Sequence, residues 1–572
     1  MFKGKRTLYQ WTFRVRYSKN LEKSVFFFAK EPFFKNIYLL KSNKCCIFAL
    51  LLTIKSISMQ NSLSNIMFQP EVEHIDEYRK AAELGNPIGL CNLGLCYAQG
   101  VGVKQDETQA FALYLQAAEQ DFAVGQHNVA ICYIHGAGVE QNYEKALYWF
   151  HKAAEQGFAH AQASLADCYR FGEVIEPDLE RALYWDIKAA EQDIAPCQDN
   201  VARAYYFGST FEQDLEKALY WWQRAAENGF DRAQNAFGTC YLEGTGVEQD
   251  YEKALYWFHK AAEQGNAKAQ CNIGVCYYNG WGVEQNLELA VEWYYKAAEQ
   301  GFSEAQKELG NWYLEGIGVK QDEQQAIHWY RKAAELGHIE AQFSLGECLR
   351  LGKGTEANEK EAFDWYYKAA ELGHPEAQYS VAECYRLGLG TNQDDTNAFF
   401  WYLKVAEQGY AEAQYSVADS YFRGIGTEVN FEKAFEWYTM SAEKGHVGAQ
   451  YNLGHYLMLG EGFEQNVTLA EYWFRKAAEQ GLPMSQTALA ICYIRGWGVE
   501  QNFEKALEWL RLAAGQGDAK AQCHIGVFYY KGWGVEQDYD QAVYWFRKSA
   551  EQAYPDAQQY LAQCYRNGVV KN

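Results

Sequence analysis

The sequence predicts an all-α solenoid, a stack of helical hairpins, on three observations. The phrase Ala-Ala-Glu-Gln-Gly or a close variant returns every 36 residues from Ala81 to Ser549, without an insertion or deletion. Within each period apolar residues recur at helical spacing, and glycines and Asp or Asn residues separate the periodic segments. Self-similarity at a period of about 20 to 50 residues is typical of stacked supersecondary units. We therefore expect residues 74–568 to form one elongated array.

Residues 267–279 of one repeat predict its first helix. An arc about 160° wide, at 100° per residue, is expected to pack. A glycine follows this helix in every copy, as a left-handed helix end requires, so Gly280 is the expected cap. The packing arc contains Ala269, Gln270, Ile273, Gly274, Cys276 and Tyr277, whereas Cys271, Asn272, Val275, Tyr278 and Asn279 are expected to point away.

The second helix of each repeat starts after a Gly-x-Gly loop. Asp or Asn stands there in 13 copies, where an N-cap side chain accepts a backbone N–H. Alanines such as Ala110 and Ala146 keep this helix narrow, and a tryptophan column of 12 copies, Trp149 to Trp545, is expected in the core. Two copies, at 172–177 and 208–211, lack the second loop glycine. A local change of curvature and a harmless loop variant both explain them.

The segment before the array has a different character. Residues 1–58 are a basic segment without the repeat, residues 59–73 a lead-in, and residues 569–572 a C-terminal tail. The apolar run 45–54 is too short for a membrane span, which needs about 20 residues. We interpret residues 1–58 as a mis-assigned start with Met59 as the first residue; the alternative is an atypical targeting segment, with residues 39–58 acting as a signal peptide.

Charge and cysteines limit the partners and the compartment. The chain carries a net charge of -22, divided between +10 over residues 1–70 and -32 over the remainder. An acidic array repels phosphate backbones, so we expect no nucleic acid partner. Nine of the 15 cysteines share one repeat position, too far from copy to copy for disulfides because neighbouring helices lie about 8–10 Å apart. Free cysteines favour a reducing compartment and a cytoplasmic location.

The repeated motifs Leu-Gly-x-x-Tyr, Gly-x-Gly-Val, Lys-Ala-x-x-Trp-Tyr-x-Lys-Ala-Ala-x-x-Gly and Ala-Gln resemble the Sel1-like repeat, a relative of the tetratricopeptide repeat. About 13 full copies carry the resemblance. It implies a right-handed αα-superhelix with the first helices on its concave surface, and an adaptor that assembles protein complexes. Some secreted members have helix pairs tied by disulfides and a link to β-lactam binding, but here the second helices contain no cysteine.

One stretch of the outward-facing positions predicts a binding groove. Aromatic, acidic and basic residues recur at i, i+4 and i+7 in consecutive repeats, with Arg423 one residue further on, which places each trio on one helix face. Tyr and Arg are frequent binding anchors, so we expect an extended segment or a helix of another protein to bind here. The rows are Phe343, Tyr379, Tyr415 and Tyr451; Glu347, Glu383 and Asp419; and Arg350, Arg386 and Arg423.

A structural alternative explains the same rows. The acids and arginines would form ion pairs on a solvated face, and the aromatic side chains would cover their neighbours; Asp167 and Arg170 repeat the charge pair elsewhere without an aromatic residue. The loop residues Trp281, Trp497 and Trp533 are a second candidate contact site, with packing on the adjacent loop as the alternative.

The sequence contains no cluster that predicts catalysis. It has no His-Glu-x-x-His or Cys-x-x-Cys motif, and its 12 histidines are scattered over different repeat positions. We therefore expect a non-enzymatic adaptor without a cofactor, a metal or an integral membrane span. The alternatives are an exported envelope or host-interaction factor and a hydrolase or β-lactam-binding protein.

Overall fold

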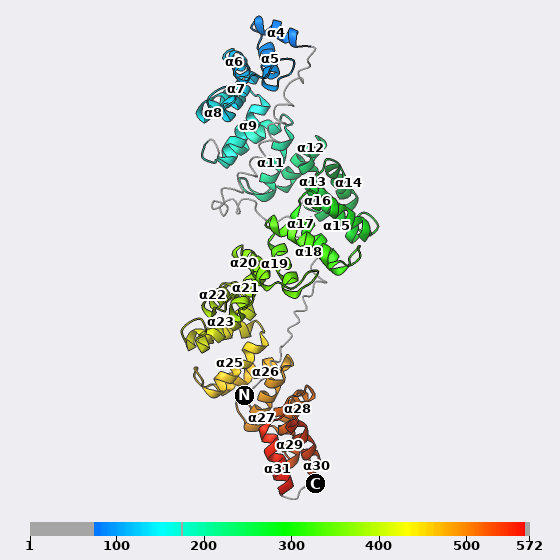
Figure 1. Cartoon of the computed structure of the whole chain (residues 1–572), viewed down its shortest axis with the longest axis vertical. Coiled ribbons are helices and arrows are strands. Elements are labelled where there is room, and N and C mark those ends of the chain that lie inside the picture. The colour runs from blue at the N-terminus through cyan, green and yellow to red at the C-terminus, as the bar shows by residue number, and fades with distance from the viewer. Residues whose placement is uncertain (1–73, 173–174, 567–572) are drawn as a thin grey trace. The chain divides into compact units, whose positions relative to one another are not determined.

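The computed structural model describes residues 74–172 and 175–566, and over these ranges it contains 28 α-helices and no strands (Figure 1). The helices divide into an N-terminal unit that ends at Gly229 and a C-terminal unit that starts at Phe230. The all-α solenoid is therefore confirmed. The predictions for residues 1–58, 59–73 and 569–572 lie outside the described residues, as do positions 173–174 of the first irregular loop.

The N-terminal unit contains nine described helices: α4 (Ile75–Glu83), α5 (Pro87–Gln99), α6 (Glu107–Glu119), α7 (Ala123–His135), α8 (Tyr143–Glu155), α9 (Ala159–Phe171), α10 (Leu179–Ala190), α11 (Ala195–Phe207) and α12 (Leu215–Glu227).

The C-terminal unit contains α13 (Asp231–Glu243), α14 (Tyr251–Glu263), α15 (Ala267–Asn279), α16 (Leu287–Glu299), α17 (Ser303–Glu315), α18 (Glu323–Glu335), α19 (Ile339–Leu351), α20 (Glu359–Glu371), α21 (Pro375–Leu387), α22 (Asp395–Glu407), α23 (Ala411–Arg423), α24 (Phe431–Glu443), α25 (Val447–Leu459), α26 (Val467–Glu479), α27 (Pro483–Arg495), α28 (Phe503–Gly515), α29 (Ala519–Lys531), α30 (Tyr539–Ala550) and α31 (Pro555–Arg566). From α5 onward the odd-numbered helices are first helices of a repeat and the even-numbered ones are second helices.

Local chemistry sets the helix ends. The first helix α15 spans the predicted residues and ends at Gly280, whose φ of 73° is left-handed. The Asn286 side chain then accepts the Leu289 N–H at 3.0 Å and starts α16. The same aspartate or asparagine cap starts each of the 13 second helices from α6 to α30, as predicted.

The second loop glycine allows one repeat to approach the previous one. A Cβ atom on Gly138 would lie 2.1 Å from the Glu107 carbonyl oxygen, at the start of the preceding second helix. No real Cβ atom tolerates that distance, so only glycine lets the loop rest on that helix. Glycine is therefore required at position 138 for two reasons: the close packing between repeats and the left-handed φ of 69°.

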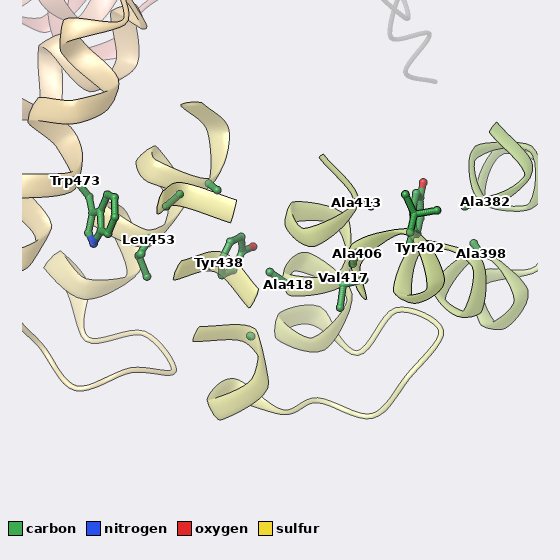
Figure 2. Packing of buried hydrophobic residues seen from close by; sticks show 14 of the residues in the cluster. Ala382, Ala398, Tyr402, Ala406, Ala413, Val417, Ala418, Tyr438, Leu453 and Trp473 are labelled. Carbon is green, nitrogen blue, oxygen red and sulfur yellow. The ribbon is translucent and has the colours of Figure 1, made fainter. Parts of the chain in front are cut away.

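The core alternates small and aromatic side chains. Figure 2 shows Tyr402 and Tyr438 among alanines and valines of neighbouring helices, and both tyrosines are almost fully buried. The tryptophan column was predicted to supply the large core contact. Instead, the residue that follows each tryptophan is often the more buried one: Trp149 is partly buried, whereas Phe150 is 2% exposed.

Two columns of glutamines join the helices. Gln300, just after the second helix α16, donates from Nε2 to Gln270 Oε1 of the first helix of the same repeat at 2.7 Å. The first-helix glutamine of the next repeat, Gln306, donates to the Ala298 carbonyl of α16 at 2.9 Å. Equivalent bonds recur along both units, and we refer to them as the glutamine relay. The relay explains why Ala-Gln and Glu-Gln-Gly recur together.

The relay is interrupted in three copies. The buried Oε1 atoms of Gln306, Gln342 and Gln414 have no hydrogen-bond partner among the residues described. In each case the second-helix glutamine of the same repeat has been replaced, by Leu336, Leu372 and Lys444 respectively. The three glutamines with an unsatisfied acceptor therefore lie in repeats that lack the glutamine donor.

One predicted outward position is wrong. Cys271 was expected to point away from the core, but only 2% of it is exposed. The period of 100° per residue predicts only which side of a helix packs within its own repeat. Residues at this position also contact the next repeat: Phe343, at the equivalent position, packs on His374, the N-cap residue of the following first helix. His127, also at this position, is equally buried.

The cysteines of the described residues are all free, and all but Cys168 are buried. All 13 lie on first helices, as predicted. Burial raises the pKa of Cys91 and of Cys276 to about 12, so these thiols stay protonated at neutral pH. They therefore behave as small apolar residues.

Candidate protein-binding face

The predicted rows lie on the first helices α19, α21 and α23, with Tyr451 on α25. We call the outward surface of these helices the candidate face. In each of the three repeats an acid on the first helix contacts an arginine one turn later and a tyrosine hydroxyl of the second helix. We call each trio a rung. The rungs are Glu347, Arg350 and Tyr366; Glu383, Arg386 and Tyr402; and Asp419, Arg423 and Tyr438.

The first rung shows how the arginine is held. Arg350 donates from Nη2 to Glu347 Oε2 at 2.8 Å and from Nε to Glu347 Oε1 at 3.2 Å. The Tyr366 hydroxyl donates to the same carboxylate. Burial, together with the Glu347 carboxylate, raises the pKa of Tyr366 well above its usual range, so the hydroxyl remains a donor. The two-point ion pair fixes the plane of the guanidinium.

The other two rungs repeat this arrangement. Arg386 donates from Nε to Glu383 Oε1 at 3.0 Å, and the Tyr402 hydroxyl donates to the same oxygen. In the third rung Arg423 donates from Nε to Asp419 Oδ1 at 2.8 Å. The arginine side chains are 41%, 46% and 55% exposed along the three rungs, whereas the acids are 32%, 27% and 22% exposed. A molecule that approaches this face therefore meets the arginines first.

The aromatic row is half-buried. Phe343 stacks on His374 of the next repeat with 4.9 Å between ring centroids, and Tyr415 lies 4.7 Å from His446 in the same way. These contacts show that the row joins neighbouring repeats. The other two rings lie against second-helix aromatics: Tyr379 is 5.5 Å from Tyr402, and Tyr451 is 6.0 Å from Phe474.

The loop tryptophans fall into two groups. Trp281 stacks on Tyr251 and Trp533 stacks on Phe503, both on the preceding repeat, at 5.5 and 5.3 Å between centroids. Packing on the adjacent loop therefore describes these two. The preceding repeat has Val467 where the other two have Tyr251 and Phe503, and Trp497 remains 42% exposed. Only Trp497 of the three keeps a large exposed ring surface.

The Asp167 and Arg170 pair differs from a rung. Asp186 occupies the second-helix position where the rungs have tyrosine, and it is buried. Arg170 turns inward to pair with both Asp167 and Asp186, so its side chain is only 15% exposed. Arg170 is therefore turned into the N-terminal unit, whereas the Asp167 side chain remains 59% exposed.

Sequence reasoning missed the hydroxyls of Tyr366, Tyr402 and Tyr438, because that column was assigned to the core. A signal was present: tyrosine occupies this second-helix position in four consecutive repeats from Tyr330 to Tyr438, and also at Tyr114 and Tyr294, where the other copies have Phe, Trp, Leu or Asp. The four consecutive repeats carry Asn, Glu, Glu and Asp at the first-helix position that accepts the bond, as Asn311 does from Tyr330 at 2.7 Å. Matching changes in two columns could have identified the rungs.

Over the described ranges, no group of three or more His, Cys, Asp and Glu side chains is placed to hold a metal ion. No helix in the same ranges is long and apolar enough to cross a membrane.

The helical hairpins, their caps and the buried residues between them define the class: an all-α repeat solenoid. Proteins built from such repeats generally mediate protein–protein interaction. The Sel1 repeat family model matches this chain 14 times in unbroken succession over residues 87–572. The chain belongs to the Sel1 repeat family.

A solved structure agrees with this assignment. The chain is 34% identical to c5321, described as a protective antigen of uropathogenic Escherichia coli with an SLR fold; the match covers 81% of this chain and 98% of that one, with a TM-score of 0.55. A Sel1 repeat protein from Oxalobacter formigenes is 31% identical over 54% of this chain and 90% of its own, with a TM-score of 0.46. A search of curated proteins found no match.

Proposed function

We propose that this protein is a non-enzymatic adaptor that holds another protein on the candidate face. The observation that carries the proposal is the set of three rungs, which present consecutive arginines in a fixed orientation. A side chain that is already held loses less conformational entropy on binding, so such arginines are good anchors. The free buried cysteines support a cytoplasmic location, where thiols stay reduced.

The structural alternative predicts the same ion pairs without a partner. Exposed ion pairs contribute only about 0–1 kcal/mol to stability, so the two interpretations differ in binding and hardly at all in folding. The arginines are therefore the residues to change, because they are the most exposed members of the rungs.

The test is an affinity purification from a lysate of the source organism with the full chain as bait. The triple variant Arg350→Ala, Arg386→Ala and Arg423→Ala is compared with Arg495→Ala, which removes an exposed arginine from the equivalent position of Arg423 on α27. We expect the triple variant to lose a protein that the wild type and Arg495→Ala both retain, with unchanged circular dichroism. Equal recovery by all three baits would reject this face as the binding site.

The resemblance to a protective antigen favours a second candidate function, an exported host-interaction factor. Cell fractionation with N-terminal sequencing of the mature protein separates the two. A mature chain recovered outside the cytoplasm with a new N-terminus near Met59 supports export, whereas recovery in the cytoplasm supports the adaptor within the cell.

A further inference from the structure

A row of carboxylates borders the candidate face on the side opposite the arginines. Glu340, Glu376 and Glu412 are each the second residue of their first helix, and their side chains are 64%, 50% and 42% exposed. We call them the acidic row. The arginines of the rungs, which we call the arginine row, lie near the other ends of the same helices.

The acidic row keeps most of its charge. Glu412 accepts a hydrogen bond from His446 Nε2 at 2.8 Å. The same imidazole accepts the Ala449 backbone N–H at Nδ1, at 3.0 Å, so Nδ1 carries no proton and the ring is neutral. Glu376 accepts a hydrogen bond from the Tyr410 hydroxyl, which is also neutral. His374 Nδ1 lies 3.5 Å from Glu376 Oε2, but this nitrogen accepts the Ala377 backbone N–H at 3.2 Å.

The remaining carboxylate, Glu340, lies 3.3 Å from Lys307 Nζ, which also contacts Glu308. Two of the three carboxylates therefore have only neutral hydrogen-bond partners. Glu340 is paired with Lys307 but remains 64% exposed, and Glu376 and Glu412 are 50% and 42% exposed, so all three carboxylates can be reached by a ligand. They form a surface that attracts cations along three consecutive repeats.

The arginine row offers hydrogen-bond donors and apolar contact. The pairs with Glu347 and Glu383 use Nε and Nη2 of Arg350 and Arg386, which leaves Nη1 of each guanidinium outside these pairs. An exposed leucine follows two of the three arginines: Leu351 is 50% exposed and Leu387 is 51% exposed. The half-buried aromatic row lies between the two charged rows.

The distance between the acidic row and the arginine row indicates which kind of partner segment fits between them. Glu340 and Arg350 are ten residues apart on one helix, which at 1.5 Å per residue is about 15 Å. A helix with its side chains is about 10–12 Å wide and carries side chains on both flanks, whereas the side chains of a strand alternate between its two faces. We infer that the candidate face holds an amphipathic helix with basic side chains on one flank and carboxylate or amide side chains on the other.

The inference rests on the proposed function and adds the chemistry of its partner. Neighbouring first helices lie about 8–10 Å apart, and seven residues of a helix span about 10.5 Å. Side chains at i, i+7 and i+14 of the partner would thus meet the three carboxylates in turn, so the bound helix needs at least about 15 residues. The net charge of -32 after residue 70 favours a partner that is basic as a whole.

The two rows also set the direction of the bound helix. If a helix is turned end for end on the same face, its two flanks exchange places. Its basic flank would then lie against the arginine row, which like-charge repulsion disfavours. The face therefore distinguishes one orientation of the partner from the other.

The test is a selection from a displayed library of 21-residue helical peptides, randomised on one face and both flanks, with the full chain as target. The affinities of the enriched peptides are then measured for three variants of the full chain. The first is the arginine-row triple alanine variant, and the second, the acidic-row variant, combines Glu340→Gln, Glu376→Gln and Glu412→Gln. The third is a control that combines Glu432→Gln, Glu436→Gln and Glu508→Gln. The control removes three exposed carboxylates from second helices of the same unit.

We expect the enriched peptides to carry basic residues on one flank and acids or amides on the other. The acidic-row variant should bind them roughly tenfold more weakly, because it loses three exposed charge pairs, and the control should bind them normally. Circular dichroism checks that each variant is folded.

Two results would overturn the inference, and they are distinguishable. In the first result, the enriched peptides no longer bind the arginine-row variant, but they contain prolines or carry one sign of charge on both flanks. This result supports the proposed function and rejects the inference that the partner is an amphipathic helix with two different flanks. Peptides that bind all variants equally, or a library that yields no binder, reject both the helix and the face.

Discussion

Replacing Leu336 with glutamine should stabilise the repeat formed by α17 and α18. The change supplies the donor that the glutamine relay lacks there, next to the unsatisfied Oε1 of Gln306. The backbone is already suitable, because Leu336 has φ and ψ of -78° and 0°, and Gln300, which makes the bond one repeat earlier, has -79° and 1°. The leucine is 60% exposed, so little apolar burial is lost.

The expected gain follows from the state of the acceptor. A hydrogen bond contributes about 0.5–1.5 kcal/mol net, and a buried acceptor left unpaired costs about 1–3 kcal/mol. Leu336→Gln pairs this acceptor, and we expect it to stabilise the repeat by about 0.5–1.5 kcal/mol. The reverse change, Gln300→Leu, should cost a similar amount because it leaves Gln270 Oε1 without its 2.7 Å bond.

Hydrogen exchange read by mass spectrometry is the suitable assay, because a long repeat array does not unfold in two states and has no single free energy of unfolding. Leu336→Gln should slow exchange of the α17 and α18 amides by about two- to tenfold, with α29 and α30 unchanged. Leu336→Met is the matched control, since it has the length of glutamine and no donor. Equal exchange in the glutamine and methionine variants would refute the relay as a source of stability.

Two further predictions concern the N-terminal unit. Burial, and then the charge of a neighbouring histidine, lowers the pKa of His127 from 6.5 to about 4, so protonation favours unfolding and stability is lost as the pH falls from about 6.5 to about 4, by ~3 kcal/mol at most. His127→Cys, which copies Cys91 at the same repeat position, should reduce the loss of hydrogen-exchange protection in α7 between pH 7 and pH 5, after correction for the intrinsic pH dependence of exchange; an unchanged pH profile contradicts this explanation. Gly138→Ala should speed exchange in the α6, α7 and α8 amides clearly more than Gly157→Ala, since a Cβ atom at 138 meets the Glu107 carbonyl and one at 157 meets nothing within 4 Å; equal losses of protection would mean that only the left-handed φ matters.

The parts of the fold that depend on one repeat could be predicted from the sequence. Gly280 and Asn286 act through their own backbone neighbours, so their roles as caps were readable from spacing alone. The burial of Cys271 was not, because Cys271 belongs to a buried cluster with Tyr294 of the second helix and Leu309 of the next repeat, and the period of a single helix does not record such contacts.

In the candidate site, too, contacts within one helix could be predicted from the sequence, and contacts between helices could not. The ion pairs of Glu347 with Arg350 and of Glu383 with Arg386 follow from i, i+3 spacing on one helix. The Tyr366 hydroxyl reaches Glu347 from a residue 19 positions away, on the second helix, so only the packing of the hairpin brings them together. The acidic row was missed because its meaning depends on the neutral His446 and Tyr410 of the following repeats.

The glutamine relay bears on how an array of this kind can change length. Its bonds join residues 30 positions apart within a repeat and eight positions apart across a boundary, and both spacings are the same in each copy that makes them. Removing or inserting 36 residues at any point would bring together partners of the same type in the same register. Recombination between copies could therefore shorten or extend the chain by whole hairpins while each junction kept its cap, its close loop contact and its amide bonds.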